Sequence, residues 1–122
     1  MKILIIDDAR WQRSQLTRLL REAGHEVVVA CDGLEGLERL DEGTSAVVCD
    51  LLMPNLDGFG FLEELRARGS AVPVVIASAD IQRTSRERCE ALGARRFVSK
   101  PYKPADLLQA LTEAVSSELS SC

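Results

Sequence analysis

The feature that most constrains the fold of this chain is a regular alternation of short apolar runs with longer amphipathic segments. Each apolar run is only four to six residues long, and the runs are Ile3–Ile6, Val27–Cys31, Ala46–Cys49, Val72–Ala77 and, more weakly, Arg95–Ser99. They are rich in β-branched and other aliphatic residues, which is typical of strands buried on both faces of a parallel sheet. We therefore expect five strands.

The amphipathic segments that follow these runs have the periodicity of helices. They are Ala9–Ala23, Leu34–Leu40, Phe59–Arg68, Ile81–Leu92 and Pro104–Leu119. In the second segment Leu34, Leu37 and Leu40 are expected to form the buried face. A glycine follows each of the first four segments and is expected to end the helix, at Gly24, Gly43, Gly69 and Gly93.

A strand followed by a helix, repeated five times, predicts an α/β domain with a parallel sheet and right-handed crossovers. The 122 residues suffice for one domain whose core needs neither disulfides nor a structural metal. The formal charge of −4 argues against a domain that mainly binds nucleic acid. No apolar run approaches the roughly 18 residues of a membrane span, so a cytoplasmic protein is expected.

Polar side chains follow four of the predicted strands at the point where each strand ends. Asp7 and Asp8 follow the first run, Asp50 the third, Ser78 the fourth and Lys100 the fifth. In a parallel sheet the carboxyl ends of the strands share one edge, where ligands bind. We therefore expect three carboxylates, a hydroxyl and an ammonium to converge there.

Such a set suits a divalent cation and a phosphoryl group. Crowded carboxylates repel each other unless a positive charge is present. Mg²⁺ takes one or two carboxylates, keeps water ligands and bridges to phosphate oxygens. The ammonium of Lys100 and the hydroxyl of Ser78 can then bind phosphoryl oxygens. Phosphoryl transfer depends mainly on positioning and charge neutralisation, so this short set of groups is chemically sufficient.

These motifs, taken in order, resemble the receiver domain of bacterial two-component response regulators. They are Asp7-Asp8, Asp50-Leu51-Leu52-Met53-Pro54 with Asp57-Gly58 beyond, Ala77-Ser78-Ala79 and Lys100-Pro101. The resemblance covers about residues 2–115 and implies a single receiver domain over 1–122, with 116–122 as a C-terminal tail. It also implies a flavodoxin-like, doubly wound (βα)5 fold with strand order 2-1-3-4-5 and a cis bond before Pro101.

The resemblance implies a role for each carboxylate. Asp50 looks like the phosphoryl acceptor, an aspartate nucleophile that attacks phosphohistidine on a partner kinase. Asp8 and Asp50 would be carboxylate ligands of Mg²⁺, Asp7 would act directly or through water, and the backbone carbonyl of Leu52 would be a further ligand.

The same resemblance implies a switch. Lys100 would pair with Asp50 and then with its phosphoryl group, and Ser78 would move in to donate a hydrogen bond to a phosphoryl oxygen. Phe97 occupies the aromatic switch position. Ser78 stands where threonine is most usual and keeps the hydroxyl, whereas Phe97 has no phenolic hydroxyl to signal with.

The implied function is a phosphorylation-dependent switch that catalyses only its own phosphorylation and dephosphorylation. Its partners would be a sensor histidine kinase or phosphotransfer protein and a downstream protein bound by the fourth helix, fifth strand and fifth helix. Two copies could pair on activation. No basic DNA-reading module follows Leu119, so we expect output through proteins, unless the chain is a fragment of a longer regulator, and no insertion into a membrane.

Plainer interpretations stand beside these. Asp7-Asp8 could be a turn or helix cap, Lys100 a solvated lysine, and Phe97 ordinary core. Arginines of the fourth helix and fifth strand could be a solvated face or a surface for an acidic partner. The alternative function is a Mg²⁺-dependent phosphohydrolase of the haloacid-dehalogenase type, although that family needs D-x-D where this chain has Asp7-Asp8-Ala9. A flavin-binding module would need a glycine-rich phosphate loop that this chain lacks.

Overall fold

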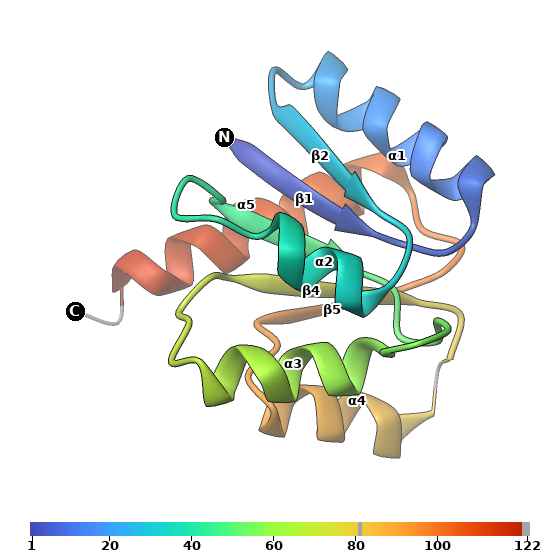
Figure 1. The fold of residues 1–122 in the computed structure, drawn as a ribbon. Coiled ribbons are helices and arrows are strands. Elements are labelled where there is room, and N and C mark those ends of the chain that lie inside the picture. The colour runs from blue at the N-terminus through green and yellow to red at the C-terminus, as the bar shows by residue number, and fades with distance from the viewer. Residues whose placement is uncertain (81, 121–122) are drawn as a thin grey trace.

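A computed structural model of the chain describes residues 1–80 and 82–120. Strands and helices alternate in it, as predicted (Figure 1). The strands are β1 (Lys2–Ile6), β2 (Glu26–Ala30), β3 (Ala46–Cys49), β4 (Val74–Ser78) and β5 (Arg96–Ser99). The helices are α1 (Arg10–Glu22), α2 (Gly33–Arg39), α3 (Gly58–Ala67), α4 (Arg83–Ala91) and α5 (Pro104–Ser120).

The five strands form one parallel sheet in the order β2-β1-β3-β4-β5, so the predicted flavodoxin-like topology is confirmed. The chain starts on β1, moves outward to β2, then crosses back over β1 to β3 and continues to β5. The order reverses between β1 and β3. In folds of this type the ligand site lies at the carboxyl ends of those two strands.

The sheet separates two apolar cores. On one face α1 and α5 pack against it through Leu20 and Leu111, and on the other α2, α3 and α4 pack against it through residues such as Phe61 (Figure 1). Alternate residues of β1 contribute to opposite cores, Ile3 and Ile5 to the first, Leu4 and Ile6 to the second. This alternation follows from the two-residue period of a strand.

The prediction of strands buried on both faces holds for the centre of the sheet and not for its edges. β3 and β4 are buried throughout, and β1 is buried from Ile3 onward. The edge strands β2 and β5 are partly exposed, because each has a neighbouring strand on one side only. β4 also begins two residues later than predicted: Pro73 has no N–H, and only its carbonyl pairs, accepting from Val47 at 2.9 Å.

Three of the four predicted glycine stops are confirmed. Gly24, Gly69 and Gly93 have φ of 91°, 70° and 104°, the left-handed conformation of a C′ residue. Gly43 does not end α2, which stops at Leu40 in an extended conformation. The predicted apolar face of α2 is also partly wrong: Leu34 is 51% exposed, and Gly33, Gly36 and Leu37 form the buried side.

Two of the predicted helix boundaries lie at the limits of the described residues. The predicted start of the fourth helix, at Ile81, lies outside the described residues, and α4 begins at Arg83 after Gln82. α5 runs to Ser120, so residues 116–120 of the expected tail are helical, and residues 121–122 lie outside the described part. None of the helices described is long and apolar enough to cross a membrane.

Candidate functional site

Three carboxylates meet where the strand order reverses. Asp7 and Asp8 directly follow β1, and Asp50 directly follows β3, the strand beside it. One carboxylate oxygen from each of the three residues lies within 4.8 Å of the other two. The expectation that these side chains converge at the carboxyl edge of the sheet is therefore met.

Asp7 is the most deeply buried of the three. It is 5% exposed, and its Oδ1 accepts a hydrogen bond from the backbone N–H of Ala9 at 2.9 Å. Its carbonyl oxygen accepts another from Nη1 of Arg13 at 2.7 Å, which ties the end of β1 to the first turns of α1. Asp8 is exposed and lies at the mouth of the cluster.

Two features hold Asp50 in place: a hydrogen bond from the next backbone N–H and the close approach of α3. Its Oδ1 accepts a hydrogen bond from the N–H of Leu51 at 2.7 Å. The start of α3 lies so close that a Cβ at Gly58 would be 2.7 Å from the carbonyl oxygen of Asp50, so only glycine fits there. Burial raises the pKa of Asp50, the ammonium of Lys100 opposes that rise, and the carboxylate of Asp7 adds to it.

The ammonium of Lys100 lies between the carboxylates, although Lys100 follows the far edge strand β5. Its Nζ is 3.0 Å from Oδ2 of Asp7 and 3.6 Å from Oδ2 of Asp50. It also donates to the side-chain carbonyl of Gln12 on α1. The bond from Lys100 to Pro101 is cis, as the resemblance implies, and the Lys100 N–H donates to the carbonyl of Ser78 at 2.8 Å.

The donor set at this edge fits a hard divalent cation. Three carboxylates face one ammonium, so the cluster carries an excess of negative charge. Carboxylate oxygens are the ligands that Mg²⁺ prefers. Burial is the main cause of the raised pKa of Asp50, and a cation there removes the repulsion from Asp7 and Asp8 that adds to it. Within the part of the chain that the structure describes, these residues form the only such group of three.

The remaining predicted site residues are Ser78, Phe97 and Leu52. Ser78 ends β4 and is 1% exposed, and its hydroxyl accepts a hydrogen bond from the N–H of Asp80 at 3.1 Å. Phe97 lies in β5, partly buried against the core under α2, α3 and α4. Leu52 has a side chain that is 64% exposed, and among the described residues no donor is bonded to its carbonyl oxygen.

Sequence reasoning missed two residues that shape the site. Gln12 has no motif, and only its place on the first turn of α1 could have indicated that it reaches Lys100. Asn55, with φ 66°, donates to the buried Asp32 at 2.6 Å. Asp32 caps α2 by accepting from the N–H of Glu35, so the loop after β3 is anchored on α2.

Comparisons with known proteins agree with this geometry. A family model described as the response regulator receiver domain matches residues 3–112. The chain is 31% identical to chemotaxis protein CheY of Listeria monocytogenes, covering 93% of this chain and 98% of that protein. It is 36% identical to the sensory/regulatory protein RpfC of Xanthomonas campestris, covering 96% of this chain and only 17% of that protein.

Solved structures give the same result. The receiver domain protein of Clostridium thermocellum matches with a TM-score of 0.90 and 27% identity, covering 99% of this chain and 98% of that one. The receiver domain of a sensor histidine kinase from Pseudomonas aeruginosa, solved with a magnesium ion in its active-site cleft, matches with a TM-score of 0.82 and 28% identity, covering 94% and 97%.

Proposed function

Because the chain belongs to the response regulator receiver family, we propose that Asp50 accepts a phosphoryl group from a phosphohistidine on a partner protein. The observation that carries the proposal is the position of the Lys100 ammonium, 3.0 Å from Asp7 and 3.6 Å from Asp50. A receiver is a signalling domain, and the family assignment favours it over a phosphohydrolase of the haloacid-dehalogenase type.

The proposed transfer is a single displacement at phosphorus. A carboxylate oxygen of Asp50 forms the new P–O bond while the P–N bond of the donor breaks, and its electron pair remains on the imidazole. Oδ1 of Asp50 already accepts the hydrogen bond from Leu51, which leaves Oδ2, the oxygen nearer Lys100, as the nucleophile. Lys100 then binds an oxygen of the transferred group.

Magnesium is the proposed cofactor. Asp7, Asp8 and Asp50 would hold it with their carboxylates, and the carbonyl of Leu52 has no competing donor among the described residues. When bound, it neutralises charge on the phosphoryl oxygens and brings them to Asp50. Support comes from the excess negative charge of the cluster and from the magnesium ion in the related Pseudomonas aeruginosa domain.

Phosphorylation would be read through Ser78 and Phe97. The hydroxyl oxygen of Ser78 accepts from the N–H of Asp80, and its own hydrogen would be available to donate to a phosphoryl oxygen as the end of β4 moves toward that oxygen. Phe97 lies on β5, next to β4, so movement of β4 reaches it directly. We place the output surface on α4, β5 and α5, where a groove of about 410 Å³ lies beside Phe97.

The charges of this output surface favour the plainer interpretation of its arginines. Arg83, Arg86 and Arg96 form ion pairs with Glu87, Glu90 and Glu113, at 2.8 to 3.7 Å. Because their charge is compensated within the chain, we propose recognition of a protein partner by shape and apolar contact rather than by strong charge. Pairing of two copies through the same surface stays a prediction.

A second groove suits the phosphoryl donor. It has a volume of about 550 Å³, it lies between α1 and the loop after β5, and Lys100 is among its lining residues. Trp11, also in its lining, is 72% exposed. A donor bound here would present its phosphohistidine beside Lys100, which supports a histidine kinase or phosphotransfer protein as the partner at this surface.

The experiment is intact-mass measurement after incubation with acetyl phosphate and Mg²⁺. We expect one added phosphoryl group in the native chain, and none with EDTA or in the Asp50→Asn variant. Lys100→Met, a neutral residue of similar length, should slow the reaction strongly. An adduct of the same size in Asp50→Asn would refute Asp50 as the acceptor.

If no sample shows an adduct, two explanations remain: the phosphoryl group is hydrolysed too fast to be detected, or the chain does not accept one. A titration with beryllofluoride, a stable analogue of the phosphoryl group, separates the two. Binding that depends on Mg²⁺ and Asp50 supports the proposal, and failure of beryllofluoride to bind refutes it.

A further inference from the structure

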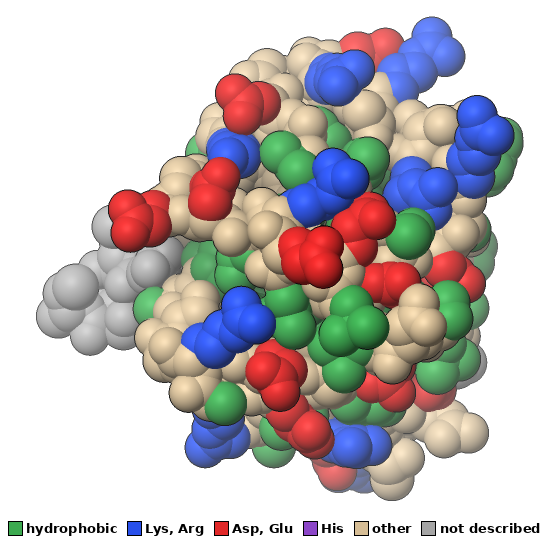
Figure 2. Space-filling model, viewed as in Figure 1, with side chains coloured by type: hydrophobic (Ala, Val, Ile, Leu, Met, Phe, Trp, Pro, Cys, Tyr) green, Lys and Arg blue, Asp and Glu red, His purple; other side chains and the backbone are tan. Residues whose placement is uncertain are grey.

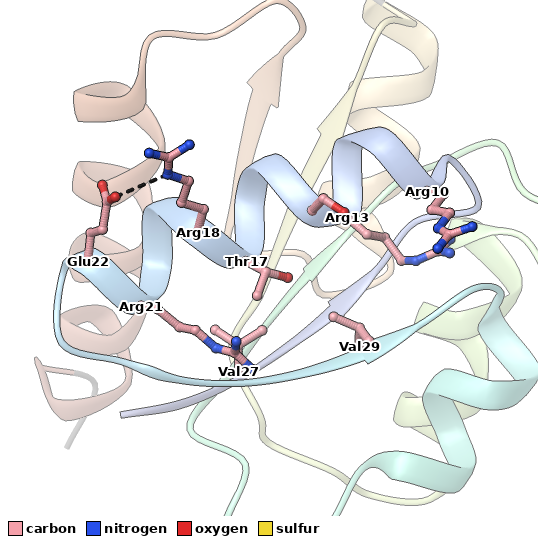
Figure 3. Close-up of a pocket in the computed structure, with 9 residues that line it drawn as sticks. Arg10, Arg13, Thr17, Arg18, Arg21, Glu22, Val27 and Val29 are labelled. Carbon is pink, nitrogen blue, oxygen red and sulfur yellow. Dashed lines mark hydrogen bonds and ion pairs between the residues drawn. The ribbon is translucent and has the colours of Figure 1, made fainter.

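A basic groove of about 570 Å³ lies between α1 and β2, and none of the three site carboxylates lines it. Figure 3 shows Arg10, Arg13, Arg18 and Arg21 along α1, with Arg18 pointing away from the valines of β2 toward Glu22. The two valines, Val27 and Val29, form the apolar floor of the groove. Such a concentration of arginine is unexpected in a chain whose formal charge is −4.

Three of these arginines have no carboxylate that compensates their charge, and two of the three have no acceptor at all among the described residues. Arg18 is paired with Glu22 at 3.2 Å, and Arg13 donates to the carbonyl of Asp7. For Arg10 and Arg21, no acceptor is found among residues 1–80 and 82–120. On the face that carries α2, α3 and α4, basic and acidic side chains are instead intermixed (Figure 2). The groove is therefore a locally positive region that attracts negatively charged groups.

The floor of the groove is also an open edge of the sheet. Among the residues that the structure describes, β2 pairs with β1 alone, and the N–H of Glu26 and the carbonyl of Ala30 are bonded on that side. Backbone groups of a strand alternate in direction, so those of Val27 and Val29 point to the opposite, unpaired side. Val29 is 36% exposed. Four backbone groups at this edge are thus available to another strand.

We propose that this groove binds an extended, acidic segment of a partner protein, which adds to β2 as a sixth strand. The N–H and carbonyl groups of Val27 and Val29 would pair with the backbone of that segment. Alternate side chains of an added strand point to the α1 side, where carboxylates would meet Arg10 and Arg21.

The open edge favours a peptide over a nucleic acid. A phosphodiester backbone would use the arginines but leave the backbone groups of Val27 and Val29 without partners, whereas a peptide strand uses both features. The arginines could also serve only to keep other chains away from the edge, since charged residues protect exposed strands from aggregation. These two alternatives predict different binding, and the following experiment separates them from the proposal.

The probe is a blocked octapeptide of alternating Glu and Val, titrated into isotopically labelled protein and followed by NMR. We expect saturable shifts centred on the amides of Val27 and Val29, weakened by added salt. The matched peptide with Lys in place of Glu should not bind. Equal binding of both peptides, shifts confined to other elements, or tighter binding of an oligonucleotide of the same net charge would each overturn the proposal.

Two variants test the charge and the edge separately. Arg10→Gln/Arg21→Gln should weaken binding of the Glu–Val peptide about tenfold, whereas Arg68→Gln, at the end of α3, should not change it. Val29→Pro removes one outward N–H and should abolish binding, while the bonds to β1 persist because proline is tolerated at such edge positions. Unchanged affinity in either groove variant overturns the proposal, and circular dichroism verifies that each variant is folded.

Discussion

Replacing Asp50 by asparagine should stabilise the metal-free protein at neutral pH. The carboxylate of Asp50 faces Lys100 at 3.6 Å, but Asp7 and Asp8 are within 4.8 Å, and burial adds a desolvation cost. Asparagine removes the charge while its side-chain oxygen can still accept from Leu51. Asp50, the proposed phosphoryl acceptor, would then lower the free energy of unfolding of the metal-free protein.

The magnitude follows from these distances. At an effective dielectric constant of about 20, a charge pair at 3.6 Å is worth about 4.6 kcal/mol and one at 4.8 Å about 3.5 kcal/mol. Because 4.8 Å is the upper limit of the distance to Asp7, the repulsion from Asp7 offsets at least about three quarters of the attraction to Lys100. Asp8 is exposed and its repulsion is discounted for solvent screening. The desolvation cost of the buried carboxylate therefore decides whether the substitution stabilises the protein. We expect Asp50→Asn to raise the free energy of unfolding by about 1–2 kcal/mol.

Urea denaturation in EDTA, at pH 7 and at lower pH, measures this gain. Folding raises the pKa of Asp50 above its ordinary value of 3.8. The charged carboxylate therefore lowers the stability of the fold by its full amount when the pH is above the raised pKa. As the pH falls through that pKa, the native carboxyl protonates and the penalty shrinks. The advantage of asparagine should therefore decline with acidification and vanish below about pH 3.8.

Asp80→Asn is the matched control, because hydrogen bonds from Ser85 and from the N–H of Gln82 lower the pKa of Asp80. Its carboxylate stabilises the protein above the ordinary pKa, and that contribution is lost as the pH falls through the lowered one. This variant should thus be less stable than the native chain at pH 7. If Asp50→Asn were only as stable as the native chain at pH 7, or less stable, the attraction to Lys100 would outweigh the cost of burial, and the expected stabilisation would be refuted.

Three further predictions concern the metal and the loops. Magnesium at one hundred times its Kd should stabilise the native chain by about 2.7 kcal/mol in thermal denaturation, and much less in the Asp50→Asn variant. Gly58→Ala should cost about 1–3 kcal/mol, because its Cβ would meet the backbone of Asp50 at 2.7 Å, whereas Gly43→Ala, 3.3 Å from a side-chain oxygen, should change urea stability little. Asn55→Ala should cost about 1 kcal/mol and raise the pKa of Asp32, measured by NMR, because it removes their hydrogen bond; an unchanged pKa would contradict this.

The sequence predicts the central sheet well because a strand buried on both faces must be apolar at every position. β3 has the predicted bounds, and the helix stops at Gly24 and Gly69 follow from the conformational freedom of glycine. The face of α2 could not be predicted, since glycine has no apolar side chain to count. A Cβ at Gly36 would lie 2.4 Å from Ile6, so there the helix packs through its backbone.

The carboxylates and Lys100 could be predicted as a group because topology alone brings the carboxyl ends of parallel strands together. The contact of Gln12 with Lys100 depends instead on where one long side chain of α1 lies over the sheet. The bond from Asn55 to Asp32 likewise joins two loops whose proximity no local pattern encodes. Such contacts follow from packing between elements, which periodicity does not describe.

The contact of Lys100 with Asp7 joins residues that are 93 positions apart and that directly follow β5 and β1, two strands separated in the sheet by β3 and β4. A contact of this separation meets the full entropy cost of closing the chain before it gains any energy. We therefore expect it to form late in folding, after helical circular dichroism has recovered. During refolding, the ability to bind beryllofluoride should then appear later than the helical signal. Binding at the site would therefore report that β5 has joined the sheet.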